Sequence, residues 1–473
     1  MAERVFVVTG LGYGDEGKGT TTHWLCSRHR AHTVVRTGGP QAFHRVVKAD
    51  GGEHLHSQLG SGTLSGAATH LSKNMVIDPH AILTEGNALM YEHGIRNVFL
   101  TLTIHQDALV IAPFHAIANR LRELIRGDDR HGSVGVGVGE TVLDAEVTGD
   151  AAIRAKDLGK PYLREKLEAI RIRKIQELEE VIERVDRLPQ DAEKKARAEI
   201  ENLKNSDAVQ WAVERFGELA GRARIVDTEY LADILGRRGT VVFEGSQGVL
   251  LDRWYGFHPY TTKVRTVPET ALSLIRECNY HGEIKSLGIL RAYHTRHGAG
   301  PFVTECPTLT KQLPDANNRE HSWQGSFRVG FFDAVAAKYA IGACGGEKAL
   351  DGLILTCVDR VRSLGVWGIC RSYTIPHAMQ NNEFFLTDDS GDVIGMIIRR
   401  GCDDQQLKRQ EELGKLLRQC SPGITSFAIA SEESQEKVIS FCSEVMEEEM
   451  NVPVVAVSVG QTEKDKIEVI PTS

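Results

Sequence analysis

A chain of 473 residues with 41% apolar residues can bury a large core, and its length alone permits two or three domains. The net charge of −8 and the pI near 6.2 give no broad attraction to nucleic acid, so any polyanion must be bound locally. The nine cysteines form no CxxC pair, no apolar run reaches the roughly 18 residues of a membrane span, and no secretory pattern precedes the first predicted strand. We therefore expect free buried thiols, a cytoplasmic location, and neither a membrane nor a nucleic-acid partner.

Short apolar runs rich in β-branched residues recur along the chain. Because they are continuous rather than alternating, and helical patterns separate many of them, they favour an α/β fold with a largely parallel central sheet covered on both faces. The expected strands are Val5–Val8, Thr33–Arg36, Asn97–Thr103, Ala108–Ile111, Val241–Phe243, Ile284–Leu290, Gly352–Thr356 and Val452–Val457.

Residues 158–220 depart from this alternation. Oppositely charged residues at i,i+4 spacing accompany an apolar stripe, with an interruption at Pro189, which predicts two long exposed helices. A charge run of this kind is typical of a solvated helical face. A surface that binds a partner is the alternative interpretation.

A glycine-rich loop, "GYGDEGKG" (12–19), follows the first strand and opens a helical segment. Glycines spaced four apart and followed by a lysine let backbone N–H groups and a positive charge meet phosphate oxygens at a helix N-terminus, so the segment predicts a P-loop-like strand–loop–helix. Gly19 replaces the usual Ser or Thr, and the loop carries two acids, Asp15 and Glu16. An acid beside a polyanion is costly unless it binds metal or takes a proton, and a glycine-rich turn with solvated acids is the alternative.

The "YGDEGKG" form of this loop resembles the WGDEGKG signature of adenylosuccinate synthetases, which join aspartate to inosine monophosphate (IMP) using GTP. Four further segments resemble signatures of the family in the correct order: "TGGPQAFHR" (37–45), "FEGSQGVLLD" (243–252), "HPYTT" (258–262) and "ILRAYHTRHGAGPFVTE" (289–305). The similarity continues weakly to "SVGQTEKDKI" (458–467). The chain is thus identified as a divergent member. The resemblance implies a single domain over 1–473, a helical excursion at 158–220 and a homodimer.

The resemblance also implies the chemistry. The family phosphorylates the 6-oxygen of a purine nucleotide, and an amine then displaces the phosphate. Asp15 matches the base, which also contacts Mg²⁺, and His44 matches the acid, since a histidine with a pKa near 6.5 can donate a proton at neutral pH. Gln247 matches the glutamine that holds the 6-oxygen, and Phe43 takes the position of a second metal contact.

By the same resemblance, GTP contacts Gly14, Glu16, Gly17, Lys18 and Gly19 with its phosphates, Arg328 supports the triphosphate, and Ser458, Gly460 and Asp359 lie on the guanine side. The family's Lys-Leu-Asp triplet is Cys357-Val358-Asp359 here. The aspartate can still accept from guanine, so we expect GTP, with ATP as the alternative because the lysine is lost.

Gln41, Ser133 and Thr262 match residues that bind the purine nucleotide. The aspartate site departs most from the family. Where the family has arginines, this chain has Val136, Gly325, Ser326 and Phe327, and each lost charge-assisted pair is worth on the order of 1.5–3 kcal/mol.

Arg319, Arg296 or Arg265 could compensate for these losses, and Arg154 is the nearest candidate for the arginine that the family donates across its dimer interface. We expect synthesis of adenylosuccinate from IMP, GTP and aspartate. The alternatives are the same chemistry with another amine or a modified purine, or a GTP-binding sensor without ligase activity.

Overall fold

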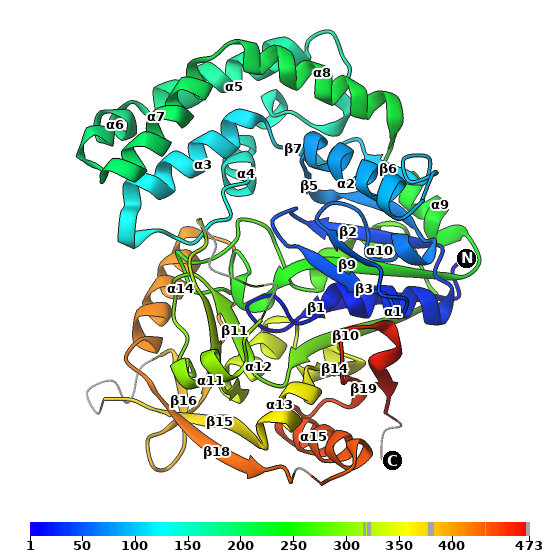
Figure 1. Cartoon of the computed structure of the whole chain (residues 1–473), viewed down its shortest axis with the longest axis vertical. Coiled ribbons are helices and arrows are strands. Elements are labelled where there is room, and N and C mark those ends of the chain that lie inside the picture. Colours follow the sequence, from blue (N-terminus) through cyan, green and yellow to red (C-terminus); the bar gives the residue numbers. More distant parts are fainter. Residues whose placement is uncertain (316–317, 319–322, 377–382, 431, 470–473) are drawn as a thin grey trace.

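A large twisted sheet forms the centre of the computed structural model, which describes residues 1–315, 318, 323–376, 383–430 and 432–469 (Figure 1). Its strands lie in the order β20 (Lys466–Glu468), β19 (Val454–Ser458), β14 (Gly352–Thr356), β10 (Glu283–Arg291), β1 (Arg4–Gly10), β9 (Thr240–Gly248), β2 (Thr33–Gly38), β5 (Ala68–Ile77), β6 (Leu102–His105) and β8 (Arg224–Val226), with β7 (Leu109–Val110) beside β5. Every pairing in this sheet is parallel except that of β19 with β20. The predicted α/β fold class is confirmed.

One predicted strand begins at the wrong residue, and the strands β5, β8 and β20 of the central sheet were not predicted. The strand expected over Asn97–Thr103 begins at Leu102, because the preceding residues form a turn in which Thr101 N donates to Asn97 O at 3.1 Å. The ten-residue strand β5 was missed because half of its residues are polar. Thr69, His70 and Ser72 are nevertheless buried, and Ser72 Oγ donates to Arg36 O at 2.8 Å. Apolar continuity does not reveal such a strand.

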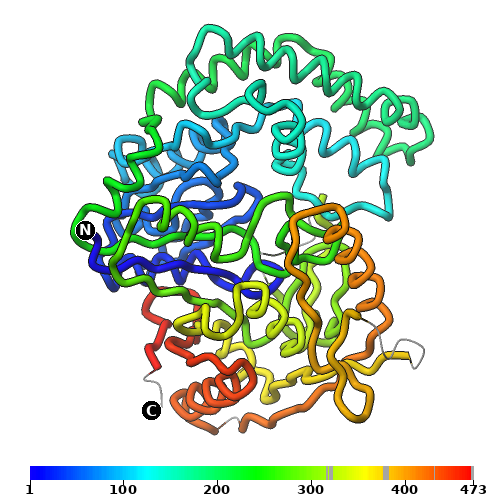
Figure 2. Tube along the Cα trace, turned by 180° about the vertical axis from the view of Figure 1, so that it is seen from behind, coloured from blue at the N-terminus to red at the C-terminus, as the bar shows by residue number. Residues whose placement is uncertain are grey.

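A second, smaller sheet was also absent from the prediction. It contains β13 (Phe332–Asp333), β15 (Val366–Thr374), β17 (Val393–Met396), β16 (Phe385–Thr387) and β18 (Ser421–Ala428). Two antiparallel strand pairs stand apart from both sheets: the hairpin of β3 (His44–Val47) with β4 (Glu53–His56), and β11 (His294–His297) with β12 (Phe327–Gly330). The C-terminal helix α15 (Gln435–Met450), red in Figure 2, lies at the end of the molecule opposite the long helices described next.

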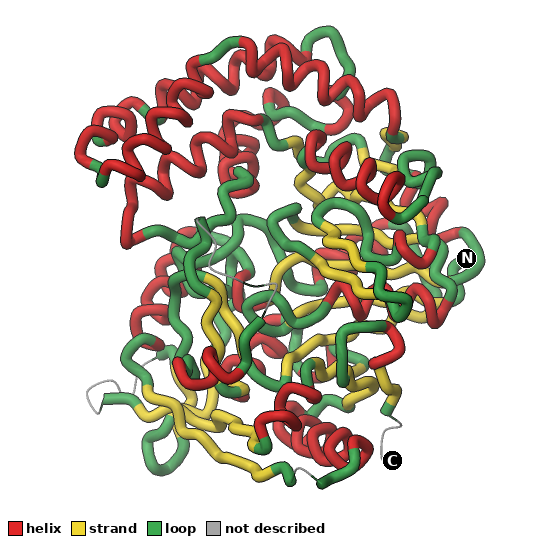
Figure 3. The backbone as a smooth tube through the Cα atoms, in the orientation of Figure 1, coloured by secondary structure: helices red, strands yellow, loops and turns green. Residues whose placement is uncertain are grey.

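The charged region forms four helices rather than the two expected: α5 (Leu163–Glu177), α6 (Glu179–Glu183), α7 (Gln190–Lys204) and α8 (Asp207–Arg222). They gather above the sheet with α3 (Pro113–Arg126), as Figure 3 shows in red. Leu167, Leu203 and Phe216 are buried in their shared core, so the apolar stripe is not solvated. Arg120 on α3 and Glu199 on α7 form a two-pronged ion pair at 2.5 and 2.7 Å. The single domain over 1–473 stays a prediction.

All nine cysteines are free thiols, as expected, but only four of them are buried: Cys26, Cys344, Cys370 and Cys442. Four more are half-buried, and Cys402 is exposed. No helix in the described ranges has both the length and the apolar character that crossing a membrane requires.

Candidate active site

The predicted site residues follow the carboxyl ends of neighbouring strands. In the order β19-β14-β10-β1-β9-β2, six adjacent parallel strands end at one edge of the central sheet. Ligands of open α/β sheets bind outside this edge, where the strand order reverses. The residues brought to it are Ser458, Asp359, Arg291, Asp15, Gln247 and His44.

The glycine-rich loop binds the carboxylate of one of its own residues, Glu16. Glu16 Oε1 accepts from the backbone N–H groups of Gly12 at 2.9 Å and Gly14 at 2.8 Å, and its Oε2 lies 2.6 Å from Lys18 Nζ. Both charged side chains are buried. These N–H groups and this ammonium are the partners that a phosphate would take in a P-loop. A bound phosphate must therefore displace the Glu16 carboxylate.

Gly19 is a glycine because the β3–β4 hairpin lies against the start of α1 (Lys18–His29). A Cβ at Gly19 would lie 2.8 Å from His44 Cβ and 3.0 Å from Arg45 O. A serine or threonine with a hydroxyl for Mg²⁺ does not fit there. Any metal ligand from this loop must come from another residue.

Asp15 is the side chain suited to that task. Its backbone is left-handed (φ 61°), and its carboxylate is 29% exposed. His297 Nε2 lies 3.2 Å from Asp15 Oδ2. Burial raises the pKa of Asp15, but the hydrogen bond and charge of His297, with Arg291 and Lys18, more than offset that effect and lower it. His297 in turn has a raised pKa, because this partner outweighs burial.

An ionised, accessible carboxylate is the oxygen ligand that Mg²⁺ takes from proteins beside substrate phosphates, so Asp15 fits the ion. The other predicted metal residue, Phe43, lies in the loop before β3 with its side chain exposed. Only its backbone oxygen could serve a hard cation. Both metal roles stay predictions.

His44 belongs to a buried charged triad. Its Nδ1 lies 2.6 Å from Glu244 Oε1, and Arg36 Nη1 lies 3.3 Å from Glu244 Oε2. Ser61 N donates to Glu244 Oε2 at 3.0 Å, and the Ser61 hydroxyl also bonds this carboxylate. Glu244 and Arg36 are 0% exposed. The ionised carboxylate therefore accepts from His44 Nδ1–H, which fixes the tautomer of the ring.

The expectation of an ordinary pKa for His44 is wrong. Burial lowers it to about 4, although Glu244 raises it in opposition. The ring is therefore neutral at pH 7, and its Nε2, buried and without a protein partner among the described residues, carries the lone pair. Acid chemistry at Nε2 requires that it first gain a proton, and Glu244 stabilises the imidazolium so formed. Burial also lowers the pKa of other histidines, most strongly of His54, to about 4, and of His70 and His294, to about 3.

Gln247 presents an unused amide at this edge. An irregular register between β1 and β9 and a left-handed backbone (φ 51°) turn this residue out of the ladder. It is only 8% exposed, and neither amide atom has a partner in the part of the chain that the structure describes. The next residue, Gly248, packs against Gly12 of the phosphate loop. A buried, unpaired amide beside this loop is suited to a ligand.

The predicted substrate residues divide into two groups. Gln41 Nε2 donates to Thr262 Oγ1 at 3.0 Å, so those two lie together. The Ser133 hydroxyl instead donates to Asn119 Oδ1 on α3 at 2.7 Å. For Ser133 to contact a phosphate, its hydroxyl must give up the hydrogen bond to Asn119.

On the β14 and β19 side, a cavity of about 330 Å³ is lined by Val358, Asp359 and Val459, with α15 opposite. Asp359 lies in the first turn of α13 (Val358–Leu364), and burial raises its pKa. Ser458 Oγ donates to Gly460 O at 3.0 Å and lies 3.3 Å from Lys466 Nζ.

The sequence analysis missed Lys466. It is 7% exposed, and burial lowers its pKa to about 8, while Cys357 and Asp465 act to raise it. Lys466 supplies a positive charge near Cys357, the position at which adenylosuccinate synthetases carry the lysine of their Lys-Leu-Asp triplet. Lys466 is the cross-strand partner of Ser458 in the antiparallel pair β19–β20, and the sequence alone does not show this pairing.

Arg328 is bound to protein groups. Its Nη1 lies 2.5 Å from Glu305 Oε2, and its Nη2 donates to Gly300 O at 3.1 Å. It is the cross-strand partner of Arg296 in the β11–β12 pair. A triphosphate would compete with Glu305 for it.

The two segments in which other residues replace the family's arginines lie next to each other. An ideal Cβ at Gly132 would lie 3.5 Å from Gln324 O, and Gly298 N donates to Ser326 O at 2.9 Å. The loop of Val136 therefore adjoins the segment of Gly325 and Phe327.

Of the arginines considered as replacements, Arg296 is buried, donates to Pro301 O at 2.6 Å and lies over the Tyr13 ring. Arg265 Nε lies 3.5 Å from Asp252 Oδ2. Arg319 is outside the described residues. The interface candidate Arg154 donates to Asp107 O at 3.0 Å.

An α/β sheet with a phosphate loop, an ionised aspartate, a histidine–glutamate pair and an unpaired amide at one edge defines a nucleotide-dependent enzyme of phosphoryl transfer. The sequence profile of adenylosuccinate synthetase matches residues 7–467. The adenylosuccinate synthetase of Saccharopolyspora erythraea is 33% identical over 383 residues, covering 78% of this chain and 81% of its own. This chain therefore belongs to the adenylosuccinate synthetase family and is a ligase.

Two solved structures share the fold. Fully ligated adenylosuccinate synthetase from Plasmodium falciparum has a TM-score of 0.72 at 19% identity, with 98% of this chain and 100% of that one covered. The succinoaminodeoxyadenylate synthetase of cyanophage S-2L, bound to dGMP and dATP as an energy donor, has a TM-score of 0.58 at 19% identity, with 99% and 96% covered. The predicted family is confirmed.

Proposed function

We propose that this ligase phosphorylates the 6-oxygen of IMP with GTP and Mg²⁺ and then replaces the phosphate with aspartate, giving adenylosuccinate. The observation that carries the proposal is the unpaired Gln247 amide beside the phosphate loop, on the same strand as Glu244, the partner of His44. A hydrogen-bonding group for the purine oxygen, a base and a latent acid thus share one edge of the sheet.

Asp15 accepts the N1 proton of the purine, which makes the 6-oxygen nucleophilic, while the Gln247 amide hydrogen-bonds this oxygen. The γ-phosphoryl group of GTP passes to the 6-oxygen and GDP departs. Bound Mg²⁺ would be held by Asp15 and by the backbone of Phe43, and it neutralises phosphate charge. The amine then attacks C6, inorganic phosphate leaves, and the amine loses a proton.

His44 serves the transferring group. A phosphoryl dianion against its Nε2 favours the protonated ring, and Glu244, 2.6 Å from Nδ1, keeps the resulting charge paired. This interaction grows with charge on the phosphoryl oxygens, so it lowers the barrier more than it improves binding. Lys18 is freed for the phosphates when Glu16 is displaced.

GTP is the proposed donor, because Asp359 lines the cavity together with Val459, the residue between Ser458 and Gly460, and can accept from two donors of guanine. Aspartate is the proposed amine on family membership. The missing arginines support the alternative of a less acidic amine or a modified purine nucleotide. Retention of Asp15 together with His44 argues against a sensor without turnover. We also propose a homodimer, a cytoplasmic location and one domain over 1–473.

The test is to incubate the protein with Mg²⁺, GTP or ATP, IMP or GMP, and a panel of amino acids, and to identify products by mass. The proposal predicts the IMP–aspartate adduct, formed only with nucleoside triphosphate and absent with Asp15→Asn. Release of GDP without an adduct for any amine would favour the sensor.

A further inference from the structure

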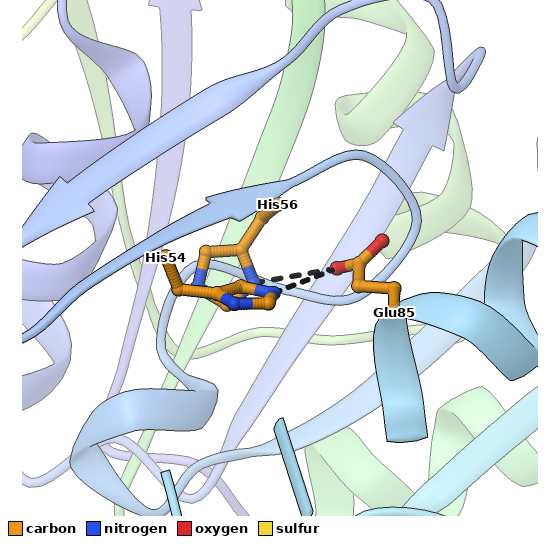
Figure 4. A group of neighbouring side chains, drawn as sticks. All are labelled: His54, His56 and Glu85. Atoms are coloured by element: carbon orange, nitrogen blue, oxygen red, sulfur yellow. Dashed lines mark ion pairs between the residues drawn. The ribbon is translucent and has the colours of Figure 1, made fainter. Parts of the chain in front are cut away.

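A second cluster of ionisable side chains adjoins the β3–β4 hairpin. His54 and His56 alternate on β4 and so share the buried face of the hairpin, where His56 is the cross-strand partner of His44. Glu85 faces them from α2 (Pro79–Glu92), as Figure 4 shows. All three side chains are at least nine-tenths buried.

The carboxylate of Glu85 is anchored by the backbone. Its Oε2 accepts from Gln58 N at 2.7 Å and from both N and Oγ of Ser57, at 3.1 and 2.9 Å. Its Oε1 accepts from Leu59 N at 3.0 Å. Oε1 is also the atom that faces the two imidazoles.

The imidazoles are poorly satisfied by contrast. Glu85 Oε1 lies 3.5 Å from His56 Nδ1 and 4.0 Å from His54 Nε2. His54 Nε2 and both nitrogens of His56 have no hydrogen-bond partner within the described ranges. An unmet buried polar atom costs about 1–3 kcal/mol, so three of them in one place indicate a missing partner.

The donor set suits a metal ion. Two imidazoles and one carboxylate form a ligand set for Zn²⁺ and similar ions, whereas Mg²⁺ prefers oxygen alone.

We propose that His54, His56 and Glu85 bind a divalent transition-metal ion of the zinc class, at a site separate from the magnesium site of Asp15. The three ligand atoms lie within 4.8 Å of one another. Tetrahedral bonds of about 2.0–2.1 Å place ligand atoms about 3.4 Å apart. The His56–Glu85 separation already meets this spacing, and a small rotation of His54 closes the rest. His93, whose ring centroid lies 5.2 Å from that of His54, or a water completes the coordination.

The ion would fix the position of the β3–β4 hairpin, which carries His44. It joins β4 to α2 next to residues 57–61, which hold the buried charged triad of His44: Arg36 Nη2 donates to Ser57 O at 3.2 Å, and Ser61 donates to Glu244. The role is therefore structural support of the acid. Metal binding itself requires no substrate, so it can fail or hold independently of the proposed reaction.

The experiment measures metal content and coordination in the full-length protein. Chelator-treated protein is loaded with Zn²⁺ or Co²⁺, desalted, and assayed by elemental mass spectrometry and visible absorption. We expect about one ion per chain and the intense visible bands of tetrahedral cobalt, without the near-ultraviolet charge-transfer bands of thiolate ligands. His56→Gln and Glu85→Gln should each lower affinity at least about tenfold, the least that removing a supporting group costs a metal site.

Two variants serve as matched controls and should bind as wild type does. His70→Gln removes a buried imidazole of β5 that contacts Thr103 rather than a carboxylate. Asp15→Asn removes the magnesium ligand. Because a ligand variant could misfold, hydrogen exchange of residues 53–59 is compared in the wild-type protein with and without Zn²⁺, and slower exchange is expected. Loading well below one ion per chain, equal loading of His56→Gln and wild type, or unchanged exchange would overturn the proposal.

Discussion

Glu244→Gln isolates the part of the site that activates His44. The substitution keeps the size of the side chain but removes the charge 2.6 Å from His44 Nδ1, and it leaves one acceptor oxygen where the carboxylate has two. The imidazolium that donates to the phosphoryl group then loses its counter-ion in a fully buried setting. A charge-assisted hydrogen bond is worth about 1.5–3 kcal/mol, which corresponds to roughly a 10- to 150-fold fall in kcat.

The same change acts on stability, because Arg36, also buried, loses its carboxylate partner. Removing one member of a buried pair costs about 3–5 kcal/mol, so urea unfolding must first establish conditions in which the variant is folded. Initial rates at saturating nucleotide then give kcat. Ser61→Ala, which removes a neighbouring bond to Glu244 without changing charge, is the matched control and should retain most activity.

A double-mutant cycle makes the test decisive. His44→Ala should lower kcat far more than it raises KM, and adding Glu244→Gln to it should cost little further, since both act through one imidazole. Full additivity of the two losses, or a wild-type kcat in Glu244→Gln, would refute the coupling.

Asp15→Asn should lower kcat at least about 10²-fold with unchanged thermal unfolding, because the amide cannot accept the purine proton, and wild-type rates would contradict this role. Asp359→Asn should reduce the kcat/KM preference for GTP over ATP; a protein that prefers ATP before mutation would contradict the assignment. The KM for aspartate should lie toward or beyond about 1 mM, and Val136→Arg with Ser326→Arg should lower it; tight saturation unaffected by both changes would show that other residues bind the carboxylates. Acidification from about pH 6.5 toward 4 should destabilise the metal-free fold, because the unfolded chain protonates histidines that the native chain keeps neutral; His44, His54, His70 and His294 have the most strongly lowered pKa values, while Asp333, with its pKa raised to about 6 by burial, opposes this by one proton. These five groups alone give a slope of about 4 kcal/mol per pH unit near pH 5, and a flat urea-unfolding free energy between pH 7 and 5 would contradict it.

The sequence predicted those parts of the fold in which local pattern and burial agree. The continuous apolar run of β1 followed by glycines specified a strand and a phosphate loop without any tertiary information. By contrast, β5 carries Ser72, whose hydroxyl finds a backbone carbonyl of the neighbouring strand, so its burial depends on a pairing that hydropathy does not encode.

The same division holds at the site. Motifs single out residues such as Asp15 and Gln247, but they do not show partnerships across the chain. His44 meets Glu244 across 200 residues, and His297 meets Asp15 across more. Burial is likewise a property of the folded chain, and it is burial, opposed by Glu244, that lowers the pKa of His44 from its ordinary value.

The most direct test of the proposed reaction follows the purine oxygen. IMP carrying ¹⁸O at position 6 is incubated with the protein, Mg²⁺, GTP and aspartate, and the inorganic phosphate is analysed by mass. Phosphorylation at the 6-oxygen predicts that each phosphate released with adenylosuccinate contains the labelled atom. Unlabelled phosphate, or phosphate formed at the same rate without IMP, would contradict the account.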